Sequence, residues 1–94
     1  MFVLTKLILT IRINQVFSLK QKRSIIKKIK THVLNTYNAC IAESHQQNNL
    51  RYLGITIGIL SNKKNGLQSR LEKLMEEMEI ISEGFIEKEE VDNI

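Results

Sequence analysis

Two segments in which apolar side chains alternate with polar or small ones constrain the fold of this chain most. In residues 2–13, five of the six odd-numbered positions are aliphatic, and Lys6 and Arg12 lie on the opposite side. In residues 52–60, aliphatic side chains alternate in the same way with tyrosine, glycine and threonine. A period of two is typical of a β-strand with one face on a core, so both segments are predicted to be strands.

Helical spacing of apolar residues follows each of these strands. Ser18 is predicted to begin the first helix, because a serine with Gln21 three positions later forms a capping box. Asn38 is predicted to end that helix, since asparagine tolerates the left-handed backbone conformation. Ser61 and Asn62 are predicted to start a second helix. Its apolar residues fall on a stripe about 100° wide, which is typical of a core-facing helix: Leu67, Leu71, Leu74, Met75 and Met78.

Two shorter strands complete the pattern. Residues 39–43 and 80–87 favour strands, and the polar residues 46–49 favour a connection between strands. The element order βαββαβ predicts an α+β ferredoxin-like sandwich, in which an antiparallel sheet carries two helices on one face. Right-handed crossovers place the third strand between the first two. We expect a single domain over residues 1–88 and an acidic C-terminal tail, residues 89–94, that frays.

In this topology one edge collects the ends of several elements. The end of the first strand, the start of the first helix, the end of the second strand and the start of the third meet there. Polar and charged residues are therefore expected to gather at this edge: Arg12, Ser18, Lys20, Lys22, Arg23, Glu43, His45 and Arg51.

The length and the cysteine count exclude several classes of protein. A chain of 94 residues with one cysteine has no disulfide framework and no site built from four thiolates. The longest apolar run, residues 53–60, is too short to span a bilayer. Lys6 and Arg12 interrupt the apolar N-terminus and no small-residue cleavage site follows, so no signal peptide is expected. We expect a cytosolic protein without a membrane partner.

The charge is divided between two parts of the chain. Residues 1–64 hold eleven Lys and Arg against Glu43 alone, a net charge of +10. Residues 65–94 hold three Lys and Arg against nine acids, a net charge of −6, which brings the total to +4. Such a division can steer a polyanion to one side of a small protein, or dock the basic half of one copy on the acidic half of another.

The first helix holds much of the positive charge. No acid occurs in residues 18–42, and Lys27 has no acid four positions earlier to pair with. Lys20, Lys22 and Arg23 fall in the first turn, where the helix dipole disfavours cations unless an anion binds there. The alternatives to phosphate binding by this helix are an ordinary solvated face and an acidic protein partner. The residues expected to contact a phosphate backbone are Lys20, Arg23, Lys27, Lys28 and Lys30, with Arg12 and Arg51 at the edge.

Lys22 is expected to play a different part. Its position falls inside the apolar arc of the helix, so its ammonium should leave the core at the shared edge. Glu43, the only acid among the first 64 residues, ends the second strand at the same edge. The sequence therefore predicts a structural Lys22–Glu43 ion pair.

A catalytic role for this edge is not expected. Strand alternation places Glu43 and His45 on one face, where a carboxylate beside an imidazole can serve acid–base chemistry. No nucleophile, oxyanion loop or second carboxylate accompanies them, and residues 14–17 lack the glycine of an acylphosphatase loop. The two histidines, His32 and His45, lie on different predicted elements and make a weak metal signal. We therefore predict a protein that is not an enzyme and holds no metal or cofactor.

Three segments carry a family resemblance: SLKQKR at residues 18–23, YNACIAE at 37–43 and GITIGILSN at 54–62. They make the chain similar to the YlxP-like family, also called domain of unknown function 503, over nearly its whole length. The resemblance implies a ferredoxin-like fold. In many bacteria, genes of this family lie among those for transcription elongation, translation initiation and ribosome maturation factors. The resemblance therefore also implies a role with RNA or the ribosome, although the family has no established activity.

The other face of the predicted sheet favours protein contacts over base stacking. In the RNA-recognition motif, which has the same topology, bases stack on aromatic side chains of the sheet. Here the third strand presents one aromatic residue, Tyr52, among small side chains. Readout of single strands by the sheet is therefore not expected. Phe2, Leu4 and Ile8 make this flat face suited to packing against a second copy.

These observations together predict a non-catalytic, cytoplasmic RNA-binding protein whose first helix contacts structured RNA, ribosomal RNA above all. The alternative is a protein-interaction or small-ligand regulatory module that forms a homodimer through its open sheet. Because phosphate contacts release counterions, RNA affinity should fall steeply with salt, whereas a packed protein interface should depend on salt much less.

Overall fold

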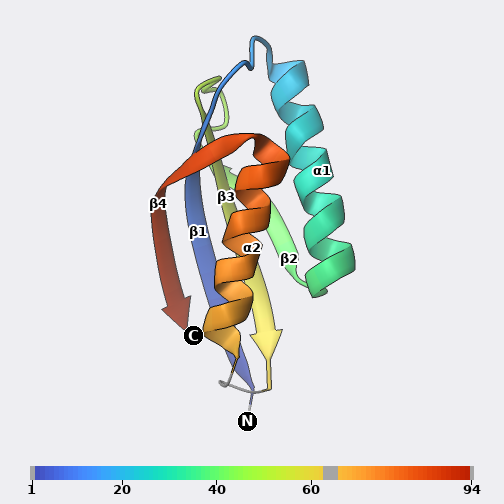
Figure 1. Ribbon diagram of the computed structural model, residues 1–94, viewed down its shortest axis with the longest axis vertical. Coiled ribbons are helices and arrows are strands. Elements are labelled where there is room, and N and C mark those ends of the chain that lie inside the picture. The colour runs from blue at the N-terminus through green and yellow to red at the C-terminus, as the bar shows by residue number, and fades with distance from the viewer. Residues whose placement is uncertain (1, 63–65, 94) are drawn as a thin grey trace.

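The computed structural model describes residues 2–62 and 66–93 and has the predicted order of elements. The strands form one antiparallel sheet in the order β2-β3-β1-β4, and both helices cover the same face of it (Figure 1). The elements are β1 (Val3–Ile13), α1 (Leu19–Tyr37), β2 (Cys40–His45), β3 (Tyr52–Ser61), α2 (Leu67–Ser82) and β4 (Gly84–Asn93). The α+β ferredoxin-like fold is confirmed.

The core lies between the sheet and the two helices and is almost wholly aliphatic. Alternation in β1 and β3 buries one face of each strand, and each helix contributes one stripe. Tyr37 is the only aromatic side chain of this core among the described residues. The fully buried aliphatic residues are Leu7, Leu9, Ile11, Leu53, Ile55, Ile57, Ile59, Ile29, Val33 and Leu74.

The ends of α1 follow the prediction. The Ser18 hydroxyl oxygen accepts a hydrogen bond from the Gln21 backbone N–H at 3.1 Å. The Gln21 side chain accepts in turn from the backbone N–H of Phe17 at 2.6 Å, one residue earlier than in a standard capping box. Asn38 ends the helix in the left-handed conformation, with φ 50°. No helix in the described ranges is long and apolar enough to cross a membrane.

The bounds of α2 differ from the prediction. Ser61 does not begin the helix; it is the last residue of β3 and pairs with Val3 of β1. The helix begins at Leu67, and its last turn includes Ile80, which was predicted to lie in a strand. Glu83 then takes the left-handed conformation, with φ 52°, and ends the helix directly before β4. Ser61 belongs to β3 and not to the helix because its backbone pairs with that of Val3 in β1.

The acidic C-terminal segment is a strand and not a frayed tail as far as Asn93. Residues 89–93 pair with residues 5–9 of β1, and the Thr5 hydroxyl donates to Asn93 Oδ1 at 2.9 Å. Ile94 lies outside the described residues. The acidic side chains do not prevent this pairing, because the strand lies at the sheet edge, where charged side chains are exposed to water.

Two β-bulges change which side chains share a face of the sheet. In β2, Glu43 pairs with Ile55 and His45 with Gly54, so Ser44 is an additional residue. In β4, Lys88 pairs with Thr10 and Ile86 with Ile11, so Glu87 is an additional residue. An inserted residue reverses the alternation beyond it. The face away from the helices, which we call the open face, therefore carries side chains that simple alternation assigns to the core side.

Candidate nucleic-acid interface

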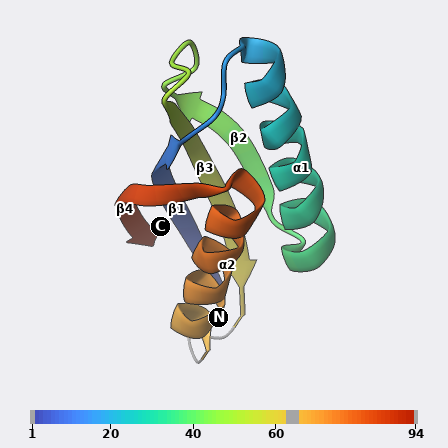
Figure 2. The same ribbon diagram turned by 45° about the horizontal axis from the view of Figure 1, so that its top comes forward.

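The predicted edge exists at the end of the molecule where β1 ends and α1 begins. The start of α1, the end of β1 and the loop between β2 and β3 lie together there (Figure 2). The backbone N–H of Ile13 donates to the carbonyl of Arg51 at 2.8 Å, which ties the end of β1 to that loop. Residues that are far apart in sequence therefore share one surface.

Lys22 is buried at this end and organises the loop. Only 1% of its surface is exposed. Its ammonium donates to the backbone carbonyls of Gln46 at 2.5 Å and Asn49 at 2.7 Å, and lies 3.5 Å from Glu43 Oε2. Glu43 Oε2 is itself buried and accepts no hydrogen bond among the described residues, so this ammonium is its nearest compensating charge. The two residues that were predicted to pair are thus together, and Lys22 is withdrawn from any external ligand.

The outward surface of α1, which we call the basic surface, carries the five cations predicted to contact a phosphate backbone. All five are exposed, and none forms an ion pair with an acid among the described residues. A shallow depression along this surface adds hydroxyl and amide groups from Ser24, Thr31 and Asn35. Ammonium, guanidinium, hydroxyl and amide groups are the donors that phosphate and ribose oxygens accept from. The basic surface consists of Lys20, Arg23, Lys27, Lys28 and Lys30.

The two remaining predicted cations lie away from the basic surface. Arg51 is exposed at the end of the β2–β3 loop, and its backbone N–H donates to Asn49 Oδ1 at 2.8 Å. Arg12 lies on the open face, where its Nε is 3.1 Å from Glu87 Oε1. A hydrogen bond with Tyr52 and the charge of Glu87 raise the pKa of Arg12 above its ordinary value. The predicted set therefore does not form one continuous patch, and Arg12 already has a counter-charge.

Glu43 and His45 do not share a face, contrary to the prediction. Because Ser44 is an additional residue in β2, Glu43 points to the helix side and His45 lies on the open face. The His45 ring covers Gly54 so closely that a Cβ at this position would lie 2.5 Å from the ring. Its Nε2 is 2.8 Å from Thr10 Oγ1 and its Nδ1 is 2.8 Å from Ser44 Oγ. Glu43 and His45 therefore do not form a carboxylate–imidazole pair.

One aromatic residue of the open face was missed by the sequence analysis. Phe85 lies next to Arg12 across the sheet and is exposed. Pairing with β1 sends Ile86 inward opposite Ile11 and Phe85 outward opposite Arg12. The sequence signal for an outward apolar side chain here is the dipeptide Phe85-Ile86, since two consecutive residues of a strand point to opposite faces.

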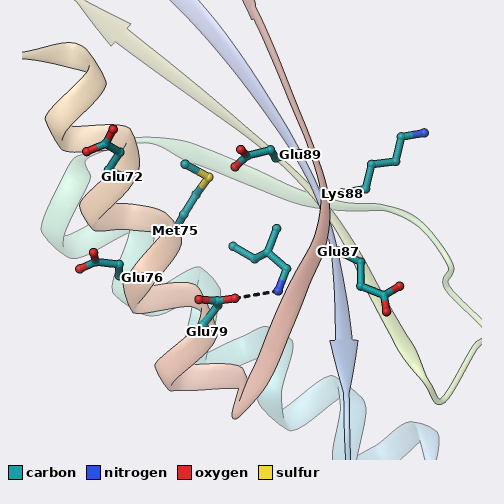
Figure 3. A pocket seen from close by; sticks show the side chains of 8 residues that line it. Glu72, Met75, Glu76, Glu79, Glu87, Lys88 and Glu89 are labelled. Atoms are coloured by element: carbon teal, nitrogen blue, oxygen red, sulfur yellow. Dashed lines mark hydrogen bonds between the residues drawn. The ribbon is translucent and has the colours of Figure 1, made fainter.

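The negative charge gathers on the other flank of the molecule. A groove of about 390 Å³ between α2 and β4 has Met75 and Ile86 among its lining (Figure 3). Glu89 points into this groove and Lys88 away from it (Figure 3). Glu79 Oε2 accepts from the Ile86 backbone N–H at 2.8 Å, so this carboxylate joins the two elements. Despite these carboxylates, no group of side chains in the described ranges has the arrangement of a metal site.

A polar cluster joins α1 and α2. Glu77 Oε1 accepts from the Tyr37 hydroxyl at 2.5 Å and lies 3.0 Å from His32 Nε2. Burial and the neighbouring carboxylate raise the pKa of Tyr37 to about 12. The hydrogen bonds from Tyr37 and His32 lower the pKa of Glu77. His32 therefore belongs to a contact between the helices, and it also lines the shallow depression beside Lys28.

The topology and the core together define a small α+β sandwich of the ferredoxin-like class. The sequence profile described as "Protein of unknown function (DUF503)" matches residues 4–90, and the chain belongs to this family, for which YlxP-like is another name. Among curated proteins, none matches the chain.

Two solved structures have a similar fold. The designed protein Foldit4 is 14% identical and has a TM-score of 0.57, with 100% of this chain and 97% of that chain covered. The protein At3g17210 from Arabidopsis thaliana is 17% identical and has a TM-score of 0.53, with 96% and 92% covered. Both likenesses concern the fold alone.

Proposed function

We propose that this protein binds structured RNA through the basic surface of α1 and does not catalyse a reaction. The observation that carries the proposal is a group of five exposed cations on α1 without acidic partners among the described residues. On the sheet, by contrast, the strand cations Lys6, Arg12 and Lys88 each lie within 4.0 Å of a carboxylate. Cations left without counter-charges on one helix are suited to a polyanion.

Such a surface can recognise the shape of an RNA but not its base sequence. Ammonium and guanidinium groups on the outside of a helix contact phosphates, and the hydroxyls of Ser24 and Thr31 can contact ribose. Folded RNA presents the closely spaced phosphates that five cations can neutralise together. Ribosomal RNA is the ligand class that we propose first, because the family resemblance points to ribosome maturation and translation.

The absence of catalysis is part of the same proposal. The bulge at Ser44 separates Glu43 from His45, so the one predicted acid–base pair is not assembled. Both ring nitrogens of His45 are occupied by hydroxyl groups of Thr10 and Ser44. An imidazole in this environment is held as part of the sheet surface.

The alternative function, a protein-interaction or small-ligand module that dimerises through the open face, is favoured by one apolar area. Leu4 and Leu60 are exposed cross-strand neighbours of β1 and β3. An adjoining groove is lined by Cys40, Ala42 and Gly58, whose small side chains leave the sheet flat. A second copy could cover this area, which is at the opposite end of β1 from Arg12.

Fluorescence anisotropy of a labelled ribosomal RNA hairpin over a salt series tests the RNA proposal. Five phosphate contacts predict a slope of log affinity against log salt of about −3.5 to −4.5. A variant with Lys20, Arg23 and Lys27 all changed to Glu should lose most of the affinity and of the slope. The proposal is wrong if the wild type does not bind at low salt.

A control of equal charge separates a local surface from a general attraction. Changing Lys6, Arg70 and Lys73 to Glu removes the same charge from exposed or half-buried positions outside α1. This control should bind nearly as the wild type does, and circular dichroism should show that both variants are folded. Equal losses in both variants would mean that net charge alone drives the binding.

A further inference from the structure

The phenylalanines of this chain are not used in its core. Phe2, Phe17 and Phe85 expose 70%, 79% and 63% of their surfaces. Burial of a large aromatic side chain is among the strongest contributions that a small domain has to its stability. Exposure of all three residues therefore calls for another role. Phe17 lies in the connection from β1 to α1 and Phe85 next to the end of β1, whereas Phe2 lies at the start of β1.

Phe85 belongs to a row of planar side chains across the open face. Arg12 is the cross-strand neighbour of Tyr52 on one side and of Phe85 on the other. The Arg12 guanidinium is held by the carboxylate of Glu87 and by the Tyr52 side chain. Two aromatic residues thus neighbour Arg12 across the sheet, and its guanidinium is restrained by two partners.

The next row along β1 carries a further ring. Thr10 pairs with Gly54 on one side and Lys88 on the other, and the His45 ring lies over Gly54. Only a glycine leaves room for the ring against the backbone, and the Thr10 hydroxyl holds its outer nitrogen. A pocket beside this ring is lined by Ile8, Thr10, His45, Gln46, Lys88 and Glu90. The two rows together form what we call the aromatic end of the open face.

The charges of the aromatic end are balanced. Arg12 is paired with Glu87 at 3.1 Å, and Lys88 with Glu90 at 3.4 Å. A balanced surface has little attraction for a phosphate backbone, but its rings and its guanidinium plane can stack on nucleobases. Arg51, which neighbours Tyr52 in the chain, links this surface to the end of the molecule where α1 begins.

We propose that the aromatic end of the open face stacks on an unpaired nucleotide of the RNA whose backbone the basic surface binds. This inference rests on the proposed RNA-binding function and adds a ligand class to it, a double-stranded RNA with an adjacent single-stranded segment. It also replaces the expectation that the sheet does not read single strands. That expectation considered only the side chains of β3, and β2 and β4 add His45 and Phe85 to the same face.

The test compares two RNAs that differ in one feature. The first is a blunt duplex, and the second is the same duplex with a five-nucleotide 3′ overhang that contains 2-aminopurine. Stacking of one base predicts about 5- to 150-fold tighter binding of the second RNA at one salt concentration. The fluorescence of 2-aminopurine should change on binding, because stacking alters its environment.

Phe85→Ala and Phe2→Ala form a matched pair of exposed phenylalanine variants. Phe85→Ala should lose the preference for the overhang and keep the wild-type affinity and salt slope for the blunt duplex. Phe2→Ala, at the other end of β1, should keep the preference. Equal binding of both RNAs by the wild type, or an unchanged preference in Phe85→Ala, overturns the inference and leaves the function of α1 intact.

Two other outcomes are distinguishable from these. Failure of the wild type to bind either RNA refutes the proposed function itself and the stacking inference with it. Sedimentation velocity at the same protein concentrations identifies a second copy as the occupant of the open face. A wild-type dimer that Phe85→Ala converts to a monomer would therefore overturn the stacking inference as well.

Discussion

The ammonium of Lys22 and the carboxylate of Glu43 lie 3.5 Å apart, and the ammonium is bound more closely by two backbone carbonyls than by that carboxylate. The buried lysine thus acts chiefly as a hydrogen-bond donor to the β2–β3 loop, from the first turn of α1. The ion pair and the loop are parts of one structure, which places Arg51 and His45 at the two ends of that loop.

Lys22→Met should destabilise the protein strongly. The change removes the donor to two loop carbonyls and leaves the Glu43 carboxylate without its counter-charge, for which a loss of about 3–5 kcal/mol is typical. Urea unfolding measures the loss. Lys20→Met, two positions earlier and exposed, should change stability by no more than about 0.5 kcal/mol. Equal effects of the two substitutions would contradict the assigned role of Lys22.

Gly54→Ala and Gly58→Ala should differ although both glycines lie on the open face of β3. A Cβ on Gly54 would lie 2.5 Å from the His45 ring and closer still to its backbone carbonyl. Displacing that backbone should reduce stability by about 1–3 kcal/mol. A Cβ on Gly58 meets only the Cys40 sulfur, at 2.9 Å, and that side chain can rotate. Thermal unfolding of both variants should therefore show a lower midpoint for Gly54→Ala than for Gly58→Ala.

Tyr37→Phe should reduce the dependence of stability on acidic pH. The Tyr37 hydroxyl is the largest cause of the lowered pKa of Glu77 in the folded protein. A lowered carboxyl pKa stabilises the fold above the unfolded pKa, and this contribution disappears as pH falls through the folded pKa. The difference in urea stability between pH 7 and pH 3 should therefore be smaller in Tyr37→Phe than in the wild type.

Tyr52→Phe is the control for that comparison. Tyr52 hydrogen-bonds Arg12, which stays charged over this pH range, and is not among the groups that shift the pKa of Glu77. Its substitution should leave the difference between pH 7 and pH 3 unchanged. If Tyr52→Phe and Tyr37→Phe alter the difference equally, Glu77 is not the group responsible.

Glu83→Gly should increase stability, in contrast to most glycine substitutions. Glu83 ends α2 with φ 52°, a conformation that glycine adopts without the steric penalty of a side chain. The gain is about 0.5–1 kcal/mol after the larger flexibility of the unfolded chain is subtracted. Glu76→Gly, at an exposed position inside the same helix, should instead lose about 1 kcal/mol. Chemical unfolding of the two variants should give opposite signs.

Much of the fold could be predicted because its signals are local. The alternation in β1 and β3, the Ser18 cap and the Asn38 stop each depend on neighbouring residues, and all four are found in the structure. The start of α2 and the length of β4 depend on pairing with β1, which is distant in sequence. Acidic side chains near the C-terminus suggested fraying, whereas backbone pairing with β1 determines the structure there.

The candidate site was predictable where it lies on one helix. The five cations of α1 are exposed because helical periodicity separates them from the apolar stripe. The open face was not predictable in the same way. The bulges at Ser44 and Glu87 follow from the register with neighbouring strands. Each bulge reverses the alternation of inward and outward side chains that a regular strand would have. His45 was therefore assigned to the wrong side, and Phe85 was overlooked.

The additional residue at Ser44 makes the two sides of β2 independent of each other. Glu43 pairs with the Lys22 ammonium in the interior, while His45, two positions later, belongs to the outer surface. In a regular strand these two side chains would lie on one face, and a substitution of either would alter the surroundings of the other. A substitution on the outer surface of β2 can therefore leave the interior and its buried charge unchanged.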